Sequence, residues 1–157
     1  MRRFEAVQGK LVTLPTRKTI GSAGYDFRCP YSYTLNAGET VVFKTGVKAC
    51  MNRNEVLYIY IRSSLGIKHK LALTNGTGII DSDYYNNPDN EGEILIPITN
   101  NGNTPYEFTI GDRIAQGIFS TYFTVDGENT EELQERVGGV GSTGKWKCPF
   151  KGIYKGG

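Results

Sequence analysis

Short runs of alternating polar and apolar residues, each closed by a turn sequence, constrain the fold of this chain more than any other feature. In Val56–Ile61 the side chains of Leu57, Ile59 and Ile61 fall on one face, and the isoleucines of Ile94–Ile98 also occupy alternate positions. Alternation with a period of two is typical of half-buried β-strands. Stretches of helical period are nearly absent, while the chain contains 20 Gly and 10 Tyr. The sequence therefore predicts an all-β domain.

Eight segments are expected to form strands, with turn sequences such as Asn36-Ala37-Gly38 and Gly111-Asp112 between them. Many short strands at this spacing favour a sandwich, a jelly roll or a distorted barrel. A chain of 157 residues suffices for one domain and is too short for two. We expect the β domain at residues 1–128, and a polar linker with a Gly-rich tail at 129–157. The expected strands are Arg3–Val7, Leu11–Leu14, Thr40–Lys44, Val56–Arg62, Leu71–Leu73, Glu93–Thr99, Tyr106–Ile110 and Arg113–Phe119.

Charge and cysteine content argue against several functional classes. The 18 Lys and Arg residues nearly balance 16 Asp and Glu without a run of like charge, which gives no sign of nucleic-acid or membrane binding. The N-terminus lacks the apolar region of a secretion signal, and no apolar stretch is long enough to span a membrane. Three cysteines without CxxC spacing, Cys29, Cys50 and Cys148, indicate reduced thiols in a cytoplasmic protein.

The stretch Ala72–Tyr84 contains two β-prone segments around an Asn-Gly-Thr-Gly turn, which predicts a β-hairpin. Asp81 and Asp83 stand two residues apart near its end, so both carboxylates point to one face if the strand continues. Paired carboxylates raise one another's pKa or bind a cation, and either property suits hydrolysis at phosphate. The alternative is a polar hairpin whose aspartates only face water.

Three shorter motifs place polar groups next to expected strands. Ser22–Asp26 is a turn of small residues that leads an acid into a strand. Arg62–Gly66 offers a guanidinium, two hydroxyls and backbone N–H groups, which together suit a phosphate chain. Gly111–Gln116 leads into a strand whose pleat puts Gln116 on the face of Ile114, where an amide needs a partner or a ligand. Each motif has a structural alternative: a plain turn, a capped turn and a strand residue satisfied by its neighbours.

The tail contains RVGGVGSTGK, Arg136–Lys145, in which glycines let backbone amides approach an anion while Ser142 and Thr143 donate hydrogen bonds. Gly139–Lys145 fits the first seven positions of the P-loop pattern, but Trp146 occupies the place of its magnesium-binding Ser or Thr. The twelve residues that follow the loop include a proline, so the helix that a P-loop opens cannot form. A phosphate-binding tail is expected, and the alternative is a linker without function.

Taken in order, these five motifs resemble those of the trimeric dUTPase family, over most of the chain from Ser22 to Lys145. The sequences GIIDSDY and GSTG carry the resemblance most strongly. The resemblance implies a jelly-roll-like β subunit in a homotrimer, with active sites at subunit interfaces and a tail that closes over a site of a neighbouring pair. It also implies hydrolysis of dUTP to dUMP and pyrophosphate, assisted by Mg²⁺.

The resemblance assigns roles to individual residues. It implies Asp81 as the general base that takes a proton from the water attacking the α-phosphate, and Tyr84 as the aromatic residue that leaves no room for a 2′-hydroxyl. Asp26 would organise the metal indirectly, through water. The other implied contacts are Asn75, Ile79 and Ile80 to uracil, Arg62, Ser63, Ser64 and Gln116 to phosphate, and Arg136, Ser142 and Thr143 to the outer phosphates.

Three positions depart from the family's pattern. The third motif usually continues as DYRG, whereas here Asn86–Glu91 is inserted and should lengthen the neighbouring loop. Ser64 stands where many members have Gly. Val140 stands where the family usually has a Phe that stacks on uracil, so the tail is expected to bind phosphate without covering the base as that ring would.

Two alternatives compete with dUTP hydrolysis. The related dCTP deaminase shares the subunit fold but needs a catalytic Glu in the strand expected at Glu93–Thr99, where Pro97 stands. Proline cannot transfer a proton, which disfavours deamination. The second alternative is a catalytically silent nucleotide-binding or regulatory protein on the same fold, against which the presence of Asp81 argues.

Overall fold

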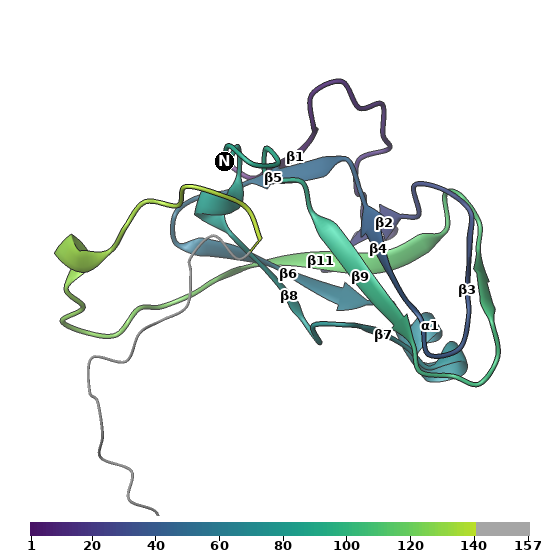
Figure 1. Cartoon of the computed structure of the whole chain (residues 1–157). Helices are drawn as coiled ribbons and strands as arrows, with labels where there is room; N and C mark the ends of the chain where they lie inside the picture. The colour runs from purple at the N-terminus through teal and green to yellow at the C-terminus, as the bar shows by residue number, and fades with distance from the viewer. Residues whose placement is uncertain (141–157) are drawn as a thin grey trace, which may run out of the picture.

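The structure is a computed structural model, and residues 1–140 of the chain are described. They form short strands, one α-helix and two 3₁₀ turns (Figure 1). None of the helices in this range is long and apolar enough to cross a membrane. The strands are β1 (Arg3–Ala6), β2 (Tyr25–Arg28), β3 (Tyr33–Leu35), β4 (Thr40–Lys44), β5 (Val47–Cys50), β6 (Glu55–Ile61), β7 (Leu71–Leu73), β8 (Gly78–Asp81), β9 (Leu95–Asn100), β10 (Tyr106–Phe108) and β11 (Arg113–Thr121); the helix is α1 (Ser63–His69), and the 3₁₀ turns are η1 (Ser82–Tyr84) and η2 (Thr130–Glu132).

The strands pair into four antiparallel sheets. The largest has the order β2-β11-β6-β8, with β11 and β6 at its centre, and a second sheet has the order β4-β9-β7. Two ribbons, β1-β5 and β10-β3, complete the fold. In Figure 1, β9 and β4 cross over β6 and β11, and buried residues of both larger sheets belong to one core cluster, so the two sheets pack against each other. This arrangement confirms the predicted all-β, jelly-roll-like subunit.

The core is formed by the apolar faces of these strands. Leu57 and Ile59 of β6 are buried, as are Ile96 and Ile98 of β9, so the predicted alternation in both segments is confirmed. Three phenylalanines from other strands, Phe27, Phe43 and Phe108, belong to the same cluster. Burial of such side chains is worth about 1.5–3 kcal/mol each and provides the main favourable term for the fold.

The predicted hairpin at Ala72–Tyr84 is wrong, although both of its segments are strands. β7 pairs with β9, where Leu73 lies opposite Ile98, while β8 pairs with β6, where Ile80 lies opposite Leu57. The Asn-Gly-Thr-Gly turn therefore carries the chain from one sheet to the other. The physical reason is that each strand finds a long apolar partner in a different sheet, which buries more surface than the two short strands could bury together.

Two other predictions from the sequence are corrected. Leu11–Leu14 forms no strand: Leu11 and Leu14 are exposed, and only Val12 of this segment packs against the core. The turn expected after Arg62 is instead the start of α1, whose seven residues bury only Leu65. A helix this short shows no clear period in the sequence. The strands β3 and β5 were not among the expected segments.

One face of the large sheet points away from the core. Along β11, Gln116 lies opposite Tyr60 of β6, and two residues further on Ile118 lies opposite Tyr58. Tyr58 in turn lies opposite Ile79 of β8. Since paired residues share a face, these side chains form one continuous surface on the side opposite Leu57 and Ile59. The candidate residues Asp26, Gln116, Ile79 and Asp81 lie along this outer face, whereas Ile80 packs against the core.

Candidate active site

The first cluster of candidate site residues is centred on Asp26 of β2. Its Oδ1 accepts a hydrogen bond from Arg62, and its Oδ2 accepts one from Arg113 Nη1 at 3.1 Å. Asp26 is 8 % exposed. Arg62 directly follows β6 and Arg113 begins β11, so the carboxylate holds the ends of two central strands together. Charge-assisted hydrogen bonds of this kind fix the guanidinium groups in one orientation.

Gln116 and Ser63 border the same cluster. Asp26 and Gln116 are paired residues on β2 and β11, and both line a pocket of about 330 Å³ with Arg62 and Ser63. A Cβ on Gly24 would lie only 2.6 Å from Gln116 Oε1, so the glycine is needed for the amide to reach this position.

The expected relation of Gln116 to Ile114 is wrong. A register shift between Arg113 and Ala115 interrupts the alternation, so Ile114 and Ala115 are both buried while Gln116 faces the pocket. Ser64 follows Ser63 in α1 and is exposed, but it does not line this pocket.

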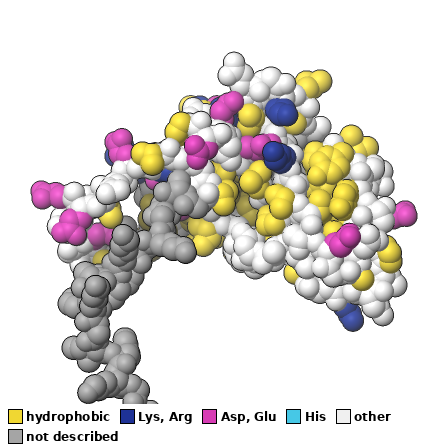
Figure 2. All heavy atoms as spheres, in the orientation of Figure 1, with side chains coloured by type: hydrophobic (Ala, Val, Ile, Leu, Met, Phe, Trp, Pro, Cys, Tyr) yellow, Lys and Arg dark blue, Asp and Glu magenta, His cyan; other side chains and the backbone are white. Residues whose placement is uncertain are grey.

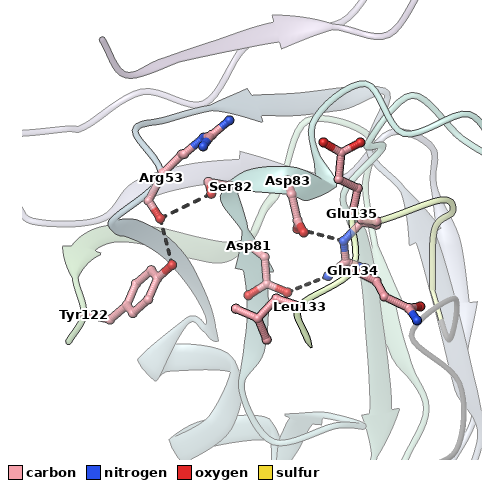
Figure 3. A pocket seen from close by; sticks show the side chains of 9 residues that line it. Arg53, Asp81, Ser82, Asp83, Tyr122, Leu133, Gln134 and Glu135 are labelled. Atoms are coloured by element: carbon pink, nitrogen blue, oxygen red, sulfur yellow. Dashed lines mark hydrogen bonds and ion pairs between the residues drawn. The ribbon is translucent and has the colours of Figure 1, made fainter. Parts of the chain in front are cut away.

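The second cluster consists of two carboxylates that share one arginine. Arg136 donates from Nη2 to Asp81 Oδ2 at 2.7 Å and from Nε to Asp83 Oδ1 at 2.8 Å. Figure 3 shows the side chains of Asp81 and Asp83 pointing to the same side. The strand does not continue to Asp83, because β8 ends at Asp81 and η1 follows. The two carboxylates nevertheless reach one guanidinium, as the predicted pairing of the acids required.

The environment of Asp81 shifts its acidity. Burial raises the pKa of Asp81 above its ordinary value, and the neighbouring Asp83 carboxylate acts in the same direction. The guanidinium of Arg136 opposes both effects without cancelling them. A carboxylate with a raised pKa is a better proton acceptor, which is the property that a general base requires.

An apolar pocket of about 460 Å³ adjoins this carboxylate pair. Asn75, Ile79, Ile80 and Tyr84 line it beside Asp81. Further lining comes from both larger sheets and from the last described segment: Val42, Gly78, Leu95, Pro97, Arg136, Gly139 and Val140.

The ring of Tyr84 is fixed in place against this pocket. It is buried, its hydroxyl donates to the carbonyl of Glu93 at 3.0 Å, and the guanidinium of Arg136 lies 5.7 Å from its centroid. The pocket therefore combines an apolar wall, a fixed aromatic ring and a carboxylate.

The structure gathers the predicted site residues into two separate groups. Asp26, Arg62, Ser63 and Gln116 form one group, and the two pockets share no lining residue. Asp81 lies opposite Val56 near the start of β6, whereas Arg62 follows its end. The strand distance between these two positions is about 20 Å. The second group is formed by Asn75, Ile79, Ile80, Asp81, Tyr84 and Arg136, while Ser142 and Thr143 lie outside the described residues.

Sequence reasoning missed the role of Arg113 as the second partner of Asp26. The contact can be predicted only once β2 and β11 are known to pair, because the pairing places Arg113 opposite Arg28, near Asp26 on the same strand. It also missed Asp89 of the inserted loop, which accepts a hydrogen bond from Gly139 N at 2.7 Å. No local sequence pattern predicts a contact between a loop and a segment fifty residues later in the chain.

The described residues offer few ligands for a divalent metal ion. Residues 1–140 contain no group of three or more His, Cys, Asp or Glu side chains that could hold a metal ion on its own. Asp26 binds two guanidinium groups, but a carboxylate offers about four acceptor sites, so it can still accept from a metal-bound water. Mg²⁺ typically keeps several waters and binds through one or two carboxylates plus substrate phosphates. The residues therefore fit such an ion when a polyphosphate supplies further ligands.

An antiparallel β fold that carries a carboxylate of raised pKa, a fixed aromatic ring and a separate pocket with two arginines has the groups that a nucleotide phosphohydrolase needs. Within that class, residues 10–144 match the family described as dUTPase, so the chain belongs to the dUTPase family. A relative from Lactococcus lactis, a deoxyuridine 5'-triphosphate nucleotidohydrolase, is 42% identical over 147 residues, which cover 92% of this chain and 98% of that protein.

Solved structures agree with this assignment. The crystal structure of the dUTPase from Streptococcus mutans superposes with a TM-score of 0.72 at 41% identity, covering 79% of this chain and 98% of that one. A variant of the dUTPase from phage phi11 of S. aureus superposes with a TM-score of 0.69 at 22% identity, covering 85% and 98%, and shares the fold. In that phage protein the coordination of a structural Mg(II) ion has been described.

Proposed function

We propose that this protein hydrolyses dUTP to dUMP and pyrophosphate by attack of water on the α-phosphate, with Asp81 as the general base. The observation that carries the proposal is the position of Asp81, a carboxylate of raised pKa at the border of the apolar pocket. Within residues 1–140 the contact of Arg136 with this carboxylate is made through Oδ2, which leaves Oδ1 to accept the proton of the attacking water. General-base assistance is worth roughly 10²–10⁴-fold in rate.

The uracil ring is assigned to the apolar pocket beside β8. β8 lies at the edge of its sheet, pairing with β6 on one side, so the backbone N–H and C=O groups of alternate residues along the Ile79–Ile80 stretch point to the open side, where a ligand can bind them. Uracil offers alternating carbonyl and N–H groups, which complement a strand edge and the amide of Asn75.

Tyr84 is assigned to the sugar. Because its hydroxyl is bound to the carbonyl of Glu93 and also accepts from Asn90 Nδ2 at 2.8 Å, the ring cannot turn away to admit a larger group. A fixed ring against the sugar would exclude a 2′-hydroxyl by contact, which selects deoxyribose.

The phosphates are assigned to the cluster around Arg62. Arg62, Ser63 and Gln116 line one pocket, Ser64 lies next to them, and Arg136 with Ser142 and Thr143 would bind the outer phosphates from the tail. Guanidinium groups bind phosphate oxygens in pairs, and Asp26 holds Arg62 in a fixed orientation for this purpose. Mg²⁺, held through water at Asp26 and by phosphate oxygens, would supply neutralisation of the negative charge on the triphosphate.

The separation of the two clusters supports the proposal of a homotrimer, in which neighbouring copies complete each site. A triphosphate cannot bridge the distance of about 20 Å along β6, so a second copy must bring its Arg62 cluster beside the Asp81 cluster of the first. The outer sheet face between the clusters carries Tyr60 and Ile79, both exposed in the single chain, and a neighbouring copy would bury them. The division into a domain at 1–128 and a tail at 129–157 belongs to the same proposal.

The cytoplasm is proposed as the location, supported by the thiols of Cys29 and Cys50, which form no disulfide among the described residues. The near balance of charge supports a small-molecule substrate, with neither nucleic acid nor a membrane as partner.

Pyrophosphate release measured in parallel on dUTP, dCTP, dTTP and UTP tests the proposal. We expect release from dUTP at a kcat/KM far above that of the other three. Deamination of dCTP would instead liberate ammonia, for which Pro97 in the pocket provides no proton-transfer group. Binding of dUTP without pyrophosphate release would show a silent nucleotide-binding protein and contradict the proposal.

A further inference from the structure

The inserted segment Asn86–Glu91 is a folded loop. Asn86 N donates to the carbonyl of Glu91 at 2.9 Å, and Glu91 N donates to the carbonyl of Asn87 at 2.9 Å. The side chain of Asn87 is 4 % exposed, and its Oδ1 accepts from the backbone N–H groups of Asp89 and Asn90 at 3.1 and 3.2 Å. These bonds close the loop on itself, so the shape of the loop is set without the carboxylate of Asp89.

The loop is also attached to the barrel at two places. Lys48 of β5 donates to Asn86 Oδ1 at 2.6 Å and forms an ion pair with Glu91 at 3.4 Å. On the other side, Asn90 Nδ2 donates to the hydroxyl of Tyr84 at 2.8 Å. The loop therefore has a fixed position relative to the ring that we assign to the sugar.

The carboxylate of Asp89 is directed at the tail. Asp89 Oδ2 accepts a hydrogen bond from Gly139 N at 2.7 Å, a charge-assisted bond. Gly139 is buried, and a Cβ on it would lie 3.4 Å from Asn90 Oδ1 and 3.5 Å from Asn87 Oδ1. The tail backbone thus rests directly on the loop, whereas the next residue, Val140, is 78 % exposed.

We propose that Asp89 is a positioning residue that docks the root of the tail, whether of its own chain or, as the family resemblance implies, of a neighbouring copy, so that Val140 closes the pocket at which dUTP binds; this inference rests on the proposed function. Gly139 and Val140 line that pocket together with Asn75 and Ile79. Because Val140 offers no ring for stacking on a base, the bond at Gly139 supplies an attachment that stacking would otherwise provide. On this proposal the inserted loop docks the tail, and Val140 then covers the pocket.

The primary test replaces Asp89 by Ala, with Glu107→Ala as the matched control. Glu107 is an exposed carboxylate on β10, in a different sheet from the pocket. We expect Asp89→Ala to raise KM for dUTP about tenfold with kcat within twofold, since docking affects binding and leaves the base untouched. Hydrogen exchange at the Gly139 amide should become faster in Asp89→Ala, already in the protein without nucleotide, and stay unchanged in Glu107→Ala.

A second variant removes the donor instead of the acceptor. Gly139→Pro deletes the N–H group that donates to Asp89. Gly139 lies beyond β11, the last strand among the described residues, so this variant leaves the barrel intact even if Asp89→Ala impairs folding of the loop. If both variants break the same bond, the double variant should show no greater loss than the larger single loss. Additive losses, or a Gly139 amide that keeps its protection in Asp89→Ala, would overturn the inference. The exchange measurement needs no turnover, so it distinguishes failure of docking from failure of the proposed function.

Discussion

The two clusters of the candidate site are built in opposite ways. Asp26 is 8 % exposed and is bound by arginines from two central strands, so the phosphate cluster is set by the barrel itself. The side chains of Asp81 and Asp83 are 53 % and 55 % exposed, and their shared ion-pair partner is Arg136 in the last described segment. The binding half of the site is therefore preorganised by the fold, while the chemical half depends on where the tail lies.

The largest effect is expected at the exposed cluster. Asp81→Asn should lower kcat by roughly 10²–10⁴-fold, because an amide cannot take the proton of the attacking water. Affinity for dUTP should stay within about tenfold, since the amide keeps the shape of the carboxylate. Pre-steady-state turnover together with equilibrium binding of dUTP measures both quantities. Near-normal turnover would remove Asp81 from the role of base.

A stability effect is expected at the buried cluster. Asp26→Ala leaves two guanidinium groups facing each other and should lower the free energy of unfolding by about 2 kcal/mol. This is less than the roughly 3–5 kcal/mol of a fully buried pair, because both arginines remain partly exposed. Urea unfolding measures the change, with Glu107→Ala as a control within about 0.5 kcal/mol. If Asp81→Asn lowers the free energy of unfolding as much as Asp26→Ala does, the proposed difference between a buried structural cluster and an exposed catalytic one is contradicted.

The sequence motifs supplied most members of both clusters, although Arg113 was missed, and the family resemblance already implied that a site is completed only at a subunit interface. Strand alternation was sufficient for β6 and β9, which are long enough to show a clear period. The partners of β7 and β8 could not be predicted, because pairing depends on apolar faces that lie far away in the sequence. The hairpin predicted from a local turn sequence was wrong for this reason.

Within the site, residue types were easier to predict than contacts. The pairing of Asp81 with Asp83 was visible as a spacing of two, although a 3₁₀ turn rather than a strand brings them to Arg136. The binding of Arg113 to Asp26 depends on the register of β2 with β11, which no local pattern encodes. The docking of Gly139 on Asp89 depends on a long chain closure that the sequence alone does not show.

A smaller effect is expected from the arginine that links the tail to the carboxylates. Arg136→Gln removes a positive charge that lowers the pKa of Asp81, so that pKa should rise further. Because the base works as a carboxylate and is lost as the pH falls through its pKa, the acid limb of activity should move to higher pH. The pH profile of kcat/KM measures this shift. A limb that moves to lower pH, or stays in place, would show that Arg136 does not act on Asp81 in the working enzyme.

The smallest effect is expected at Val140, where the exposed side chain borders the base pocket. Stacking of a base on an aromatic side chain is worth about 1–3 kcal/mol, and valine recovers only part of this through apolar contact. Val140→Phe should therefore lower KM for dUTP by up to about tenfold and leave the unfolding free energy unchanged. Steady-state kinetics of Val140→Phe and of Trp146→Ala, the latter at a position outside the described residues, show which side chain stacks on the base. If Trp146→Ala raises KM for dUTP and Val140→Phe does not lower it, the tryptophan already covers the base. A gain that survives in Asp89→Ala would show that a ring can replace the docking bond, which makes the tail, rather than the barrel, the adjustable half of the site.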